Sequence, residues 1–293
     1  MSAPEIFSRR LRRVRRDRAA ARFADHAFLI DHIIEGLLGR LDGVRREFRN
    51  ALDLGCHDGR LGEALRARGL AVVSVDAGFV FASAAGGVQC EEDRLPFADG
   101  SFDLVVSAGV LDQVNDLPGA LTLIRRVLKP DGLLLAGFAG AGSLPLLRKA
   151  VLAADMAIGG AVASRMHPMI DVRAAGDLLA RAGFALPVAD SERLSVRYAS
   201  PFRLLSDLRG MAMTNMLAEQ QAPPYGRSRL NALVEALAAA ADADGKFGES
   251  FEIIFMTGWA PGPGQPKPAR RGSGERSLAS ALSSFPAVKP SAE

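Results

Sequence analysis

Two short stretches of the sequence place glycines and carboxylates where a nucleoside ligand could bind. The stretch DLGCHDG at residues 53–59 directly follows a short apolar run and opens a helical pattern. Small residues at such a turn let the backbone approach a ligand, and the free N–H groups of the next helix face it. Asp76 ends the next apolar run about 20 residues further on, where a carboxylate accepts hydrogen bonds from ribose hydroxyls. The plainer interpretations are a helix cap at Asp53 and a turn residue at Asp76.

These residues need a parallel sheet to bring them to one edge. Between residues 50 and 138, short apolar runs alternate with helical patterns, which predicts a doubly wound parallel sheet. The expected strands are Ala51–Leu54, Ala71–Val75, Phe102–Ser107 and Leu133–Phe138, with helices Arg60–Arg68 and Pro118–Leu128.

The flanking segments predict additions to this core. Residues 1–48 contain a basic helix and one or two amphipathic helices, and residues 49–261 hold the main domain. Within it, helical segments at about 143–170 and 201–241 are expected to cover the ligand cleft as lids. Residues 262–293 are so rich in Pro, Gly and Ser that we expect a disordered tail. The remaining expected elements are helices 171–182, 201–217 and 228–241, strand material at 186–198, and a closing strand at 251–259.

The composition favours an ordinary globular protein. Apolar residues make up 48% and charged residues 24% of the chain, and no apolar run reaches the roughly 18 residues of a membrane span. Cys56 and Cys90 are too few for a disulfide framework and lack the clustering of a zinc site, so no metal is expected. The net charge of +3 does not by itself indicate nucleic acid. We expect a cytoplasmic protein without a nucleic-acid partner.

The sharpest local bias is an arginine-rich segment near the N-terminus. We expect it to form a helix with a solvated basic face; contact with a membrane surface or an acidic partner is the alternative. Its seven arginines are Arg9, Arg10, Arg12, Arg13, Arg15, Arg16 and Arg18.

Four blocks in order resemble the class I S-adenosylmethionine-dependent methyltransferases, of the type that includes biotin-precursor and quinone methyltransferases. The blocks are DLGCHDG, an acidic strand end at Asp76, EEDRLPFADGSFDLVVS from Glu91, and VLKPDGLLL from Val127. The resemblance implies an α/β, Rossmann-like fold with a mostly parallel seven-stranded sheet and helical additions. It also implies S-adenosylmethionine as cofactor.

The resemblance assigns roles to particular residues. Asp53 and Gly55 would lie beside the methionine moiety, Asp76 would hold the ribose, and Glu91 and Glu92 would flank the adenine. For the acidic pair, a solvated loop is the plainer interpretation, and Asp93 is a further candidate. The full set of expected cofactor-binding residues is Asp53, Gly55, Cys56, His57, Gly59, Asp76, Ala77, Glu91, Glu92 and Ser107.

Further blocks resemble the arginine-hydroxylase assembly factors of respiratory complex I and their alphaproteobacterial relatives. They are SAGVLDQVNDLP from Ser107, VRAAGDLLARAGF from Val172, VRYASPFRLLSDLRGMAMTN from Val196 and FEIIFMTGWAP from Phe251. This resemblance implies a bacterial protein, with a complex I subunit as a candidate substrate and a peripheral membrane contact left open.

The sequence departs from the family pattern at three places. His57 stands where the family has glycine, so an imidazole would crowd the ligand unless it has become a contact; a loop histidine without a role is the plainer interpretation. Gly142 and Leu146 replace acidic residues of the family, and Asp112-Gln113 replaces an aromatic or histidine pair.

Asp112 is the candidate catalytic residue, because it follows the third predicted strand, where such enzymes place groups that face the substrate. Arg165 and His167 are expected to be structural or exposed, and the nearby methionines Met211, Met213 and Met216 to be core. The leading hypothesis is a class I methyltransferase with an unidentified acceptor. The alternatives are a complex I assembly factor that hydroxylates an arginine, and a degenerate fold that acts as a chaperone.

Overall fold

The computed structural model describes residues 5–158, 165–219, 226–265, 273 and 277 of the 293-residue chain. Residues 5–262 belong to one compact unit, which therefore includes the N-terminal helices. Most of the predicted tail lies outside the described residues.

A seven-stranded sheet runs through this unit in the order β3-β2-β1-β4-β5-β7-β6. β1 to β5 pair in parallel, whereas β7 is antiparallel to both of its neighbours. The expected α/β, mostly parallel fold is therefore confirmed. The strands are β1 Asn50–Leu54, β2 Ala71–Asp76, β3 Val88–Gln89, β4 Phe102–Ala108, β5 Leu128–Ala139, β6 Ala185–Tyr198 and β7 Phe247–Trp259.

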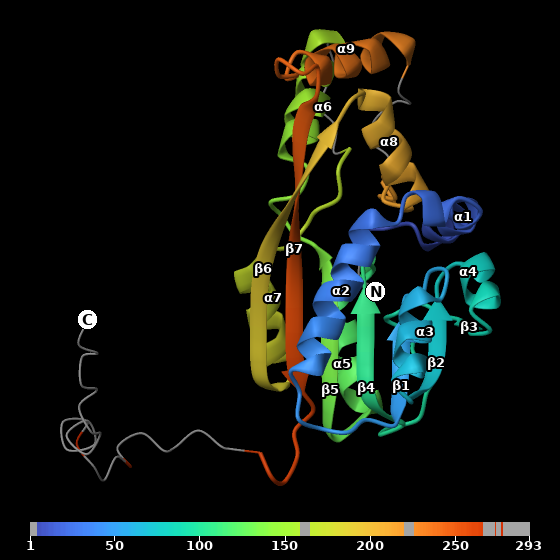
Figure 1. Cartoon of the computed structure of the whole chain (residues 1–293), viewed down its shortest axis with the longest axis vertical. Helices are drawn as coiled ribbons and strands as arrows, with labels where there is room; N and C mark the ends of the chain where they lie inside the picture. The colour runs from blue at the N-terminus through green and yellow to red at the C-terminus, as the bar shows by residue number, and fades with distance from the viewer. Residues whose placement is uncertain (1–4, 159–164, 220–225, 266–272, 274–276, 278–293) are drawn as a thin grey trace, which may run out of the picture. The chain divides into compact units, whose positions relative to one another are not determined.

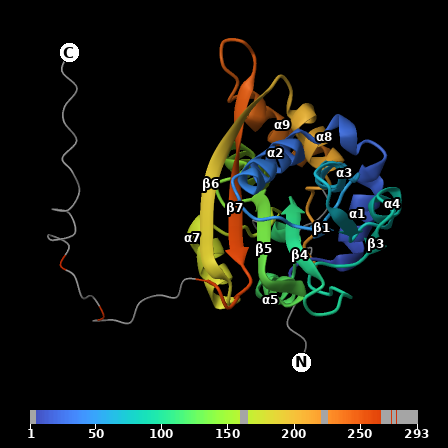
Figure 2. The same ribbon diagram turned by 60° about the horizontal axis from the view of Figure 1, so that its bottom comes forward.

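Helices cover both faces of the sheet (Figures 1 and 2). α2 and α3 contribute buried leucines and isoleucines to one face, and α5 and α7 do the same on the other. The helices are α1 Arg9–Ala20, α2 Phe28–Asp42, α3 Arg60–Ala67, α4 Phe79–Ala84, α5 Leu117–Val127, α6 Pro145–Ile158, α7 Val172–Arg181, α8 Pro201–Gly210 and α9 Arg227–Ala238, with 3-10 turns η1 Phe23–Asp25 and η2 Leu111–Gln113.

The antiparallel strands β6 and β7 are longer than β1 to β4, and their pair extends beyond the carboxyl ends of the parallel strands. Its far end carries α6, α8 and α9 (Figure 1). These helices stand over the edge where the parallel strands end, which is where an open α/β sheet binds its ligand.

Three differences from the sequence predictions have local causes. The helix expected over 201–217 ends at Gly210, because Ala212 adopts a φ of 58° and the Met213 N–H donates to the Leu208 carbonyl, a left-handed helix end. The two-residue β3 was not expected, since it is too short to show a pattern. β5 and β7 begin earlier than expected.

No helix in the described part of the chain is both long enough and apolar enough to cross a membrane.

Two glycines of α2 allow a matched test of how this helix packs on the sheet. A Cβ at Gly36 would come within 2.6 Å of the Phe255 ring, whereas a Cβ at Gly39 would meet nothing within 4 Å. We expect Gly36→Ala to lower the free energy of unfolding by about 1–3 kcal/mol through overpacking. Gly39→Ala should instead raise it by up to about 1 kcal/mol, because alanine favours the helix. Urea titrations of both variants test this, and equal effects would contradict the packing of α2.

Candidate functional site

The turn after β1 has the backbone that its glycines predict. Gly55 and Gly59 adopt φ values of 83° and 90°, and a Cβ at Gly55 would lie 2.4 Å from the Val110 side chain. His57 lies between them with a φ of 48°, in the left-handed region that favours glycine. The turn therefore retains the glycine conformation of the family pattern with a histidine in the glycine position.

The Asp76 carboxylate lies at the end of β2, as predicted, but its partner is an arginine of α1. Arg16 donates from Nε to one carboxylate oxygen over 2.7 Å and from an Nη to the other over 2.5 Å. The backbone N–H groups of Gly78 and His57 also donate to this carboxylate, over 2.7 and 3.1 Å. Burial opposes ionisation of Asp76, but the Arg16 charge and these donors hold its pKa below the ordinary value.

The second acidic group at this edge is also paired with α1. Arg12 donates to both carboxylate oxygens of Glu92, over 2.6 and 2.7 Å, and to Glu91 over 2.9 Å. Arg9 makes a bidentate pair with Asp93, at 2.7 Å for each bond. Glu91 and Glu92 are brought close to the Asp76 edge, as the resemblance implied, with the guanidinium of Arg12 against them.

The expectation of a solvated arginine face is therefore wrong for Arg12 and Arg16, which are 2% and 1% exposed. It holds for Arg10 and Arg18, which are exposed, whereas the half-exposed Arg13 also donates to Glu91, over 2.8 Å. The physical reason is the acidic edge itself: buried carboxylates must be paired, and α1 supplies the cations.

His57 is buried among α1, η1 and the end of β4. Its Nε2 donates to the Ala108 carbonyl over 2.9 Å, so its Nδ1 accepts from the Arg16 guanidinium over 3.2 Å. The ring stacks on Phe23 with a centroid separation of 4.8 Å. Burial and the Arg16 charge lower its pKa from 6.5 to about 4. The neutral ring thus contributes stability that is present above pH 6.5 and is lost as the pH falls toward 4.

Asp53 lies on β1, close enough to Asp76 for the two charges to interact. It is fully buried, with one oxygen 3.4 Å from the Ser74 hydroxyl, and a Cβ at Gly62 would lie 2.9 Å from the same oxygen. Burial, reinforced by the charge of Asp76, raises the pKa of Asp53 to about 7. Its other oxygen has no hydrogen-bond partner among the described residues. Asp53 therefore packs between β1, β2 and α3.

The remaining predicted residues support the turn and the neighbouring strand ends. The Ser107 hydroxyl donates to the Leu54 carbonyl over 2.8 Å, and the Ala77 carbonyl accepts from the Gln89 side chain over 2.9 Å. Cys56 is 1% exposed, and burial raises the pKa of its thiol. Among the described residues, no cluster of side chains could hold a metal ion.

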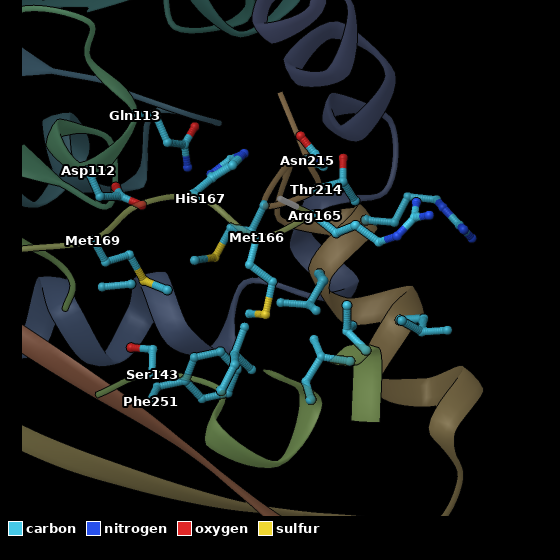
Figure 3. A pocket seen from close by; sticks show the side chains of 18 of the residues that line it. Asp112, Gln113, Ser143, Arg165, Met166, His167, Met169, Thr214, Asn215 and Phe251 are labelled. Atoms are coloured by element: carbon cyan, nitrogen blue, oxygen red, sulfur yellow. The ribbon is translucent and has the colours of Figure 1, made fainter. Parts of the chain in front are cut away.

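A cavity of about 290 Å³ opens next to this edge (Figure 3). Asp112 and Gln113 of η2 line it on the side of the sheet, and Gln113 also borders the ion pairs of α1. Most of the wall is apolar and comes from α6, α8, α9 and the loop before α7. The apolar side chains are Ala139, Leu144, Leu147, Val151, Met166, Met169, Leu205, Leu208, Met213, Leu230, Leu233 and Phe251, and the remaining polar ones are Ser143, Arg165, His167, Arg209, Thr214 and Asn215.

Two acceptor oxygens of η2 lack partners among the described residues: one carboxylate oxygen of Asp112 and the amide oxygen of Gln113. Gln113 is 2% exposed, and burial raises the pKa of Asp112 to about 7. A buried acceptor without a donor is costly, so this wall of the cavity suits a ligand group that carries N–H or O–H.

Sequence reasoning expected lid segments here but did not identify which of their residues line the cavity. His167 was expected to be structural or exposed; it does have a structural contact, since its Nε2 accepts from the Met216 N–H over 2.8 Å, yet it also lines the cavity. Arg165 likewise lines the cavity while it pairs with the buried Asp155. Met213 was assigned to the core and lines the cavity. No local sequence pattern indicates which residues line the cavity, because the lid forms only when helices distant in the sequence pack together.

The acidic residue that the family has at position 142 is missing here, but a carboxylate from another strand lies at the same place. Gly142 replaces an acid, but the carboxylate of Glu252 on β7 lies there and accepts from the Gly142 N–H over 2.7 Å. An acidic residue at position 142 would be crowded, since even a Cβ there would lie 3.0 Å from that oxygen.

Comparison with known proteins agrees with this geometry. A family described as a methyltransferase domain matches residues 52–136. The chain is 31% identical to arginine-hydroxylase NDUFAF5, mitochondrial, of Danio rerio over 94% of the chain and 88% of that protein. It is 33% identical to the malonyl-[acyl-carrier protein] O-methyltransferase of a Methylovorus species over 85% and 88%.

Solved structures show the same fold at lower identity. The YcgJ protein of Bacillus subtilis covers 79% of this chain with a TM-score of 0.56 and 18% identity, and the match spans 99% of its own chain. A putative methyltransferase of Bacillus halodurans covers 77% with a TM-score of 0.54, at 17% identity and 98% of its own chain. The chain belongs to the class I S-adenosylmethionine-dependent methyltransferase superfamily. Within it, its relatives at 31–33% identity include proteins named as arginine hydroxylases and as O-methyltransferases.

S-adenosylmethionine is the cofactor of this superfamily, and the donor set of the site suits it. A carboxylate ends β2, two more follow β3, and glycines shape the turn after β1. The space beside these carboxylates is filled by Arg12 and Arg16. The residue types at this edge therefore suit the cofactor. Whether the cofactor has space to bind depends on the position of α1, which carries Arg12 and Arg16.

The buried pair of Arg16 and Asp76 gives a stability test. Asp76→Ala leaves the guanidinium buried without its carboxylate, so we expect the free energy of unfolding to fall by about 3–5 kcal/mol. The exposed Asp177→Ala on α7 is the control and should change it by less than about 0.5 kcal/mol. Urea titration at pH 7 measures both, and similar small losses would mean that Arg16 finds another partner.

His57 gives a second test, in which two variants separate crowding from backbone strain. We expect His57→Gly to tighten S-adenosylmethionine binding, because it removes the ring and relieves the positive φ. His57→Ala removes the ring but keeps the strained backbone, so it should tighten binding less. Calorimetric titration at pH 7 gives both dissociation constants. Weaker binding in both variants would identify the imidazole as a ligand contact.

Proposed function

We propose that the chain transfers a methyl group to a small acceptor, or an acceptor side chain, held in the cavity of about 290 Å³ next to the cofactor edge. The observation that carries this proposal is the pair of unpartnered acceptor oxygens on Asp112 and Gln113 at the wall nearest that edge. The acceptor would bind with its N–H or O–H against these oxygens and its apolar part among the leucines and methionines of the lid.

The proposed site residues would contact different parts of the cofactor, according to their positions along the edge of the sheet. Asp76 would hold the ribose, and Glu91 and Glu92 would flank the adenine. Gly55, Cys56, His57 and Gly59 would shape the turn beside the methionine end, while Asp53, Ala77 and Ser107 support that turn and the strand ends. When bound, the cofactor supplies an electrophilic methyl group. The protein would contribute mainly alignment of the acceptor, which can account for much of the rate.

Asp112 would act as the group that takes the acceptor's proton. Its pKa of about 7 means that it gains its charge near neutral pH, where a general base works best. The apolar lid around it excludes water and keeps that pKa raised.

The first experiment is a calorimetric titration of the full chain with S-adenosylmethionine, followed by incubation with candidate acceptors and mass spectrometry of the products. Saturable binding and a mass gain of one CH₂ on the acceptor support the proposal. The absence of binding at millimolar ligand would reject it and favour the chaperone hypothesis.

Hydroxylation of an arginine is the second candidate. The relatives at 31% identity are named arginine hydroxylases, and the match spans nearly the whole chain. The cavity suits an arginine side chain, since a guanidinium has N–H donors for Asp112 and Gln113 and an aliphatic stem for the apolar wall. A mass gain of one oxygen atom would distinguish this reaction from methyl transfer. A protein subunit, including one of respiratory complex I as the family resemblance implies, is then the proposed partner.

Location and membrane contact stay predictions. We propose a cytoplasmic protein, although the arginine-hydroxylase relatives are named as mitochondrial. The exposed arginines Arg10 and Arg18 of α1 would make any peripheral contact with an anionic surface.

The role of Asp112 predicts a pH dependence with a definite sign. As the pH rises through about 7, its carboxylate forms and the rate of modification should rise. Asp112→Asn should lower the rate by about 10²–10⁴-fold and remove that rise. Asp177→Asn, which changes an exposed aspartate on α7, should leave both unchanged. An unaltered pH profile in Asp112→Asn would exclude Asp112 as the base.

A further inference from the structure

We propose that α1 is an internal ligand of the cofactor site, and that S-adenosylmethionine binds by displacing Arg16 from Asp76 and Arg12 from Glu92. The helix therefore sets the affinity for the cofactor. This goes beyond the proposed reaction, because it concerns how the site is opened.

The Asp76 carboxylate has no capacity left for a ribose in this structure. Each of its oxygens accepts two hydrogen bonds: one from Arg16 and Gly78, the other from Arg16 and His57. A carboxylate offers about four lone-pair sites in all. Ribose hydroxyls can therefore bind Asp76 only if Arg16 leaves, because the two backbone donors belong to the turn itself.

The pairing continues along one face of the helix. Arg9, Arg12 and Arg16 lie three and four residues apart, so they share a face, and each pairs with carboxylates of the site. Arg12 spans Glu91 and Glu92, the positions expected beside the adenine. One helix thus covers the ribose and adenine positions together.

The energetics allow this helix to be displaced. Besides the two buried arginines, Ala19 is the residue of α1 that is buried, so few apolar contacts hold the helix down. Buried ion pairs add little net stability, since the desolvation of both partners offsets much of their attraction. A cofactor that offers hydroxyl and amine donors to the same carboxylates can therefore compete.

The two ends of the helix are anchored more firmly than its middle. Before it, Phe7 is buried with Met216 and Leu217 and bridges to Leu217. After it, Phe23 is fully buried against His57 and Phe81. These anchors keep α1 close to the site whether or not its arginines are paired with the carboxylates. The helix is therefore a cover that stays attached at both ends.

The test combines binding and hydrogen exchange on the full chain. We expect Arg16→Gln to tighten S-adenosylmethionine binding by about ten- to a hundredfold, the range for hydrogen bonds to a charged group. Arg16→Lys keeps a cation beside Asp76 but loses the bidentate geometry, so it should tighten binding less and should fold even if Arg16→Gln does not. Arg10→Gln is the matched control, because Arg10 is exposed on the outer face of the same helix, and it should leave the affinity unchanged.

Hydrogen exchange of the wild-type protein needs no variant. Addition of S-adenosylmethionine should accelerate exchange of the α1 amides while those of α2 stay protected. Binding with α1 equally or better protected, or with an affinity that Arg16→Gln and Arg16→Lys leave unchanged, would overturn the proposal while the methyltransferase function stands. The absence of binding in the wild type and in every variant would overturn both. Binding by the Arg16 variants alone would also overturn the proposal, because the cofactor would then not displace Arg16 in the wild-type protein.

Discussion

The buried carboxylate of Asp76 must be neutralised, and much of the site follows from how this is done. It lies at the end of β2, fully enclosed, where an unpaired charge would cost several kcal/mol. Arg16 satisfies it from outside the sheet, which fixes the position of α1. The same guanidinium donates to Nδ1 of His57, so it also fixes the tautomer of the ring that occupies the left-handed turn after β1. One ion pair thereby connects the N-terminal helix, the glycine-type turn and the ribose position.

The second organising element is the long antiparallel pair of β6 and β7. By extending past the parallel strands, it places α6, α8 and α9 over the carboxyl edge of the sheet. A cavity forms where these helices meet η2, and most of its wall is apolar, with Asp112 and Gln113 on the side of the sheet. The raised pKa of Asp112 is a consequence of this enclosure, since burial disfavours the charged carboxylate. The chemistry available to the acceptor thus depends on a lid built from the second half of the chain.

These two elements meet at Gln113, which borders both the cavity and the ion pairs of α1. A shift of α1 would therefore change contacts of Gln113 at the wall of the cavity as well as the ion pairs at the carboxyl edge of the sheet. Arg15 adds to this connection, because it donates to Thr214, another residue of the cavity wall. The N-terminal helix and the wall of the cavity are thus connected through direct contacts.

The sequence by itself determined the parallel core, the turn after β1, and the places of Asp76, Glu91 and Glu92 at one edge. Hydrophobic periodicity and strand-end motifs are local signals, and strand ends of a parallel sheet necessarily meet. The family resemblance placed His57 at a glycine position, and the structure then showed that its backbone keeps a positive φ of 48°. Only the tertiary structure decided that Arg12 and Arg16 turn inward, because charge patterning on a helix does not reveal a buried acidic partner some 60 to 80 residues away. The same holds for Asp53, whose motif suited a ligand but whose side chain packs against Gly62, and for His167 and Arg165 in the cavity wall. Such contacts arise from long-range packing, which no short stretch of residues encodes.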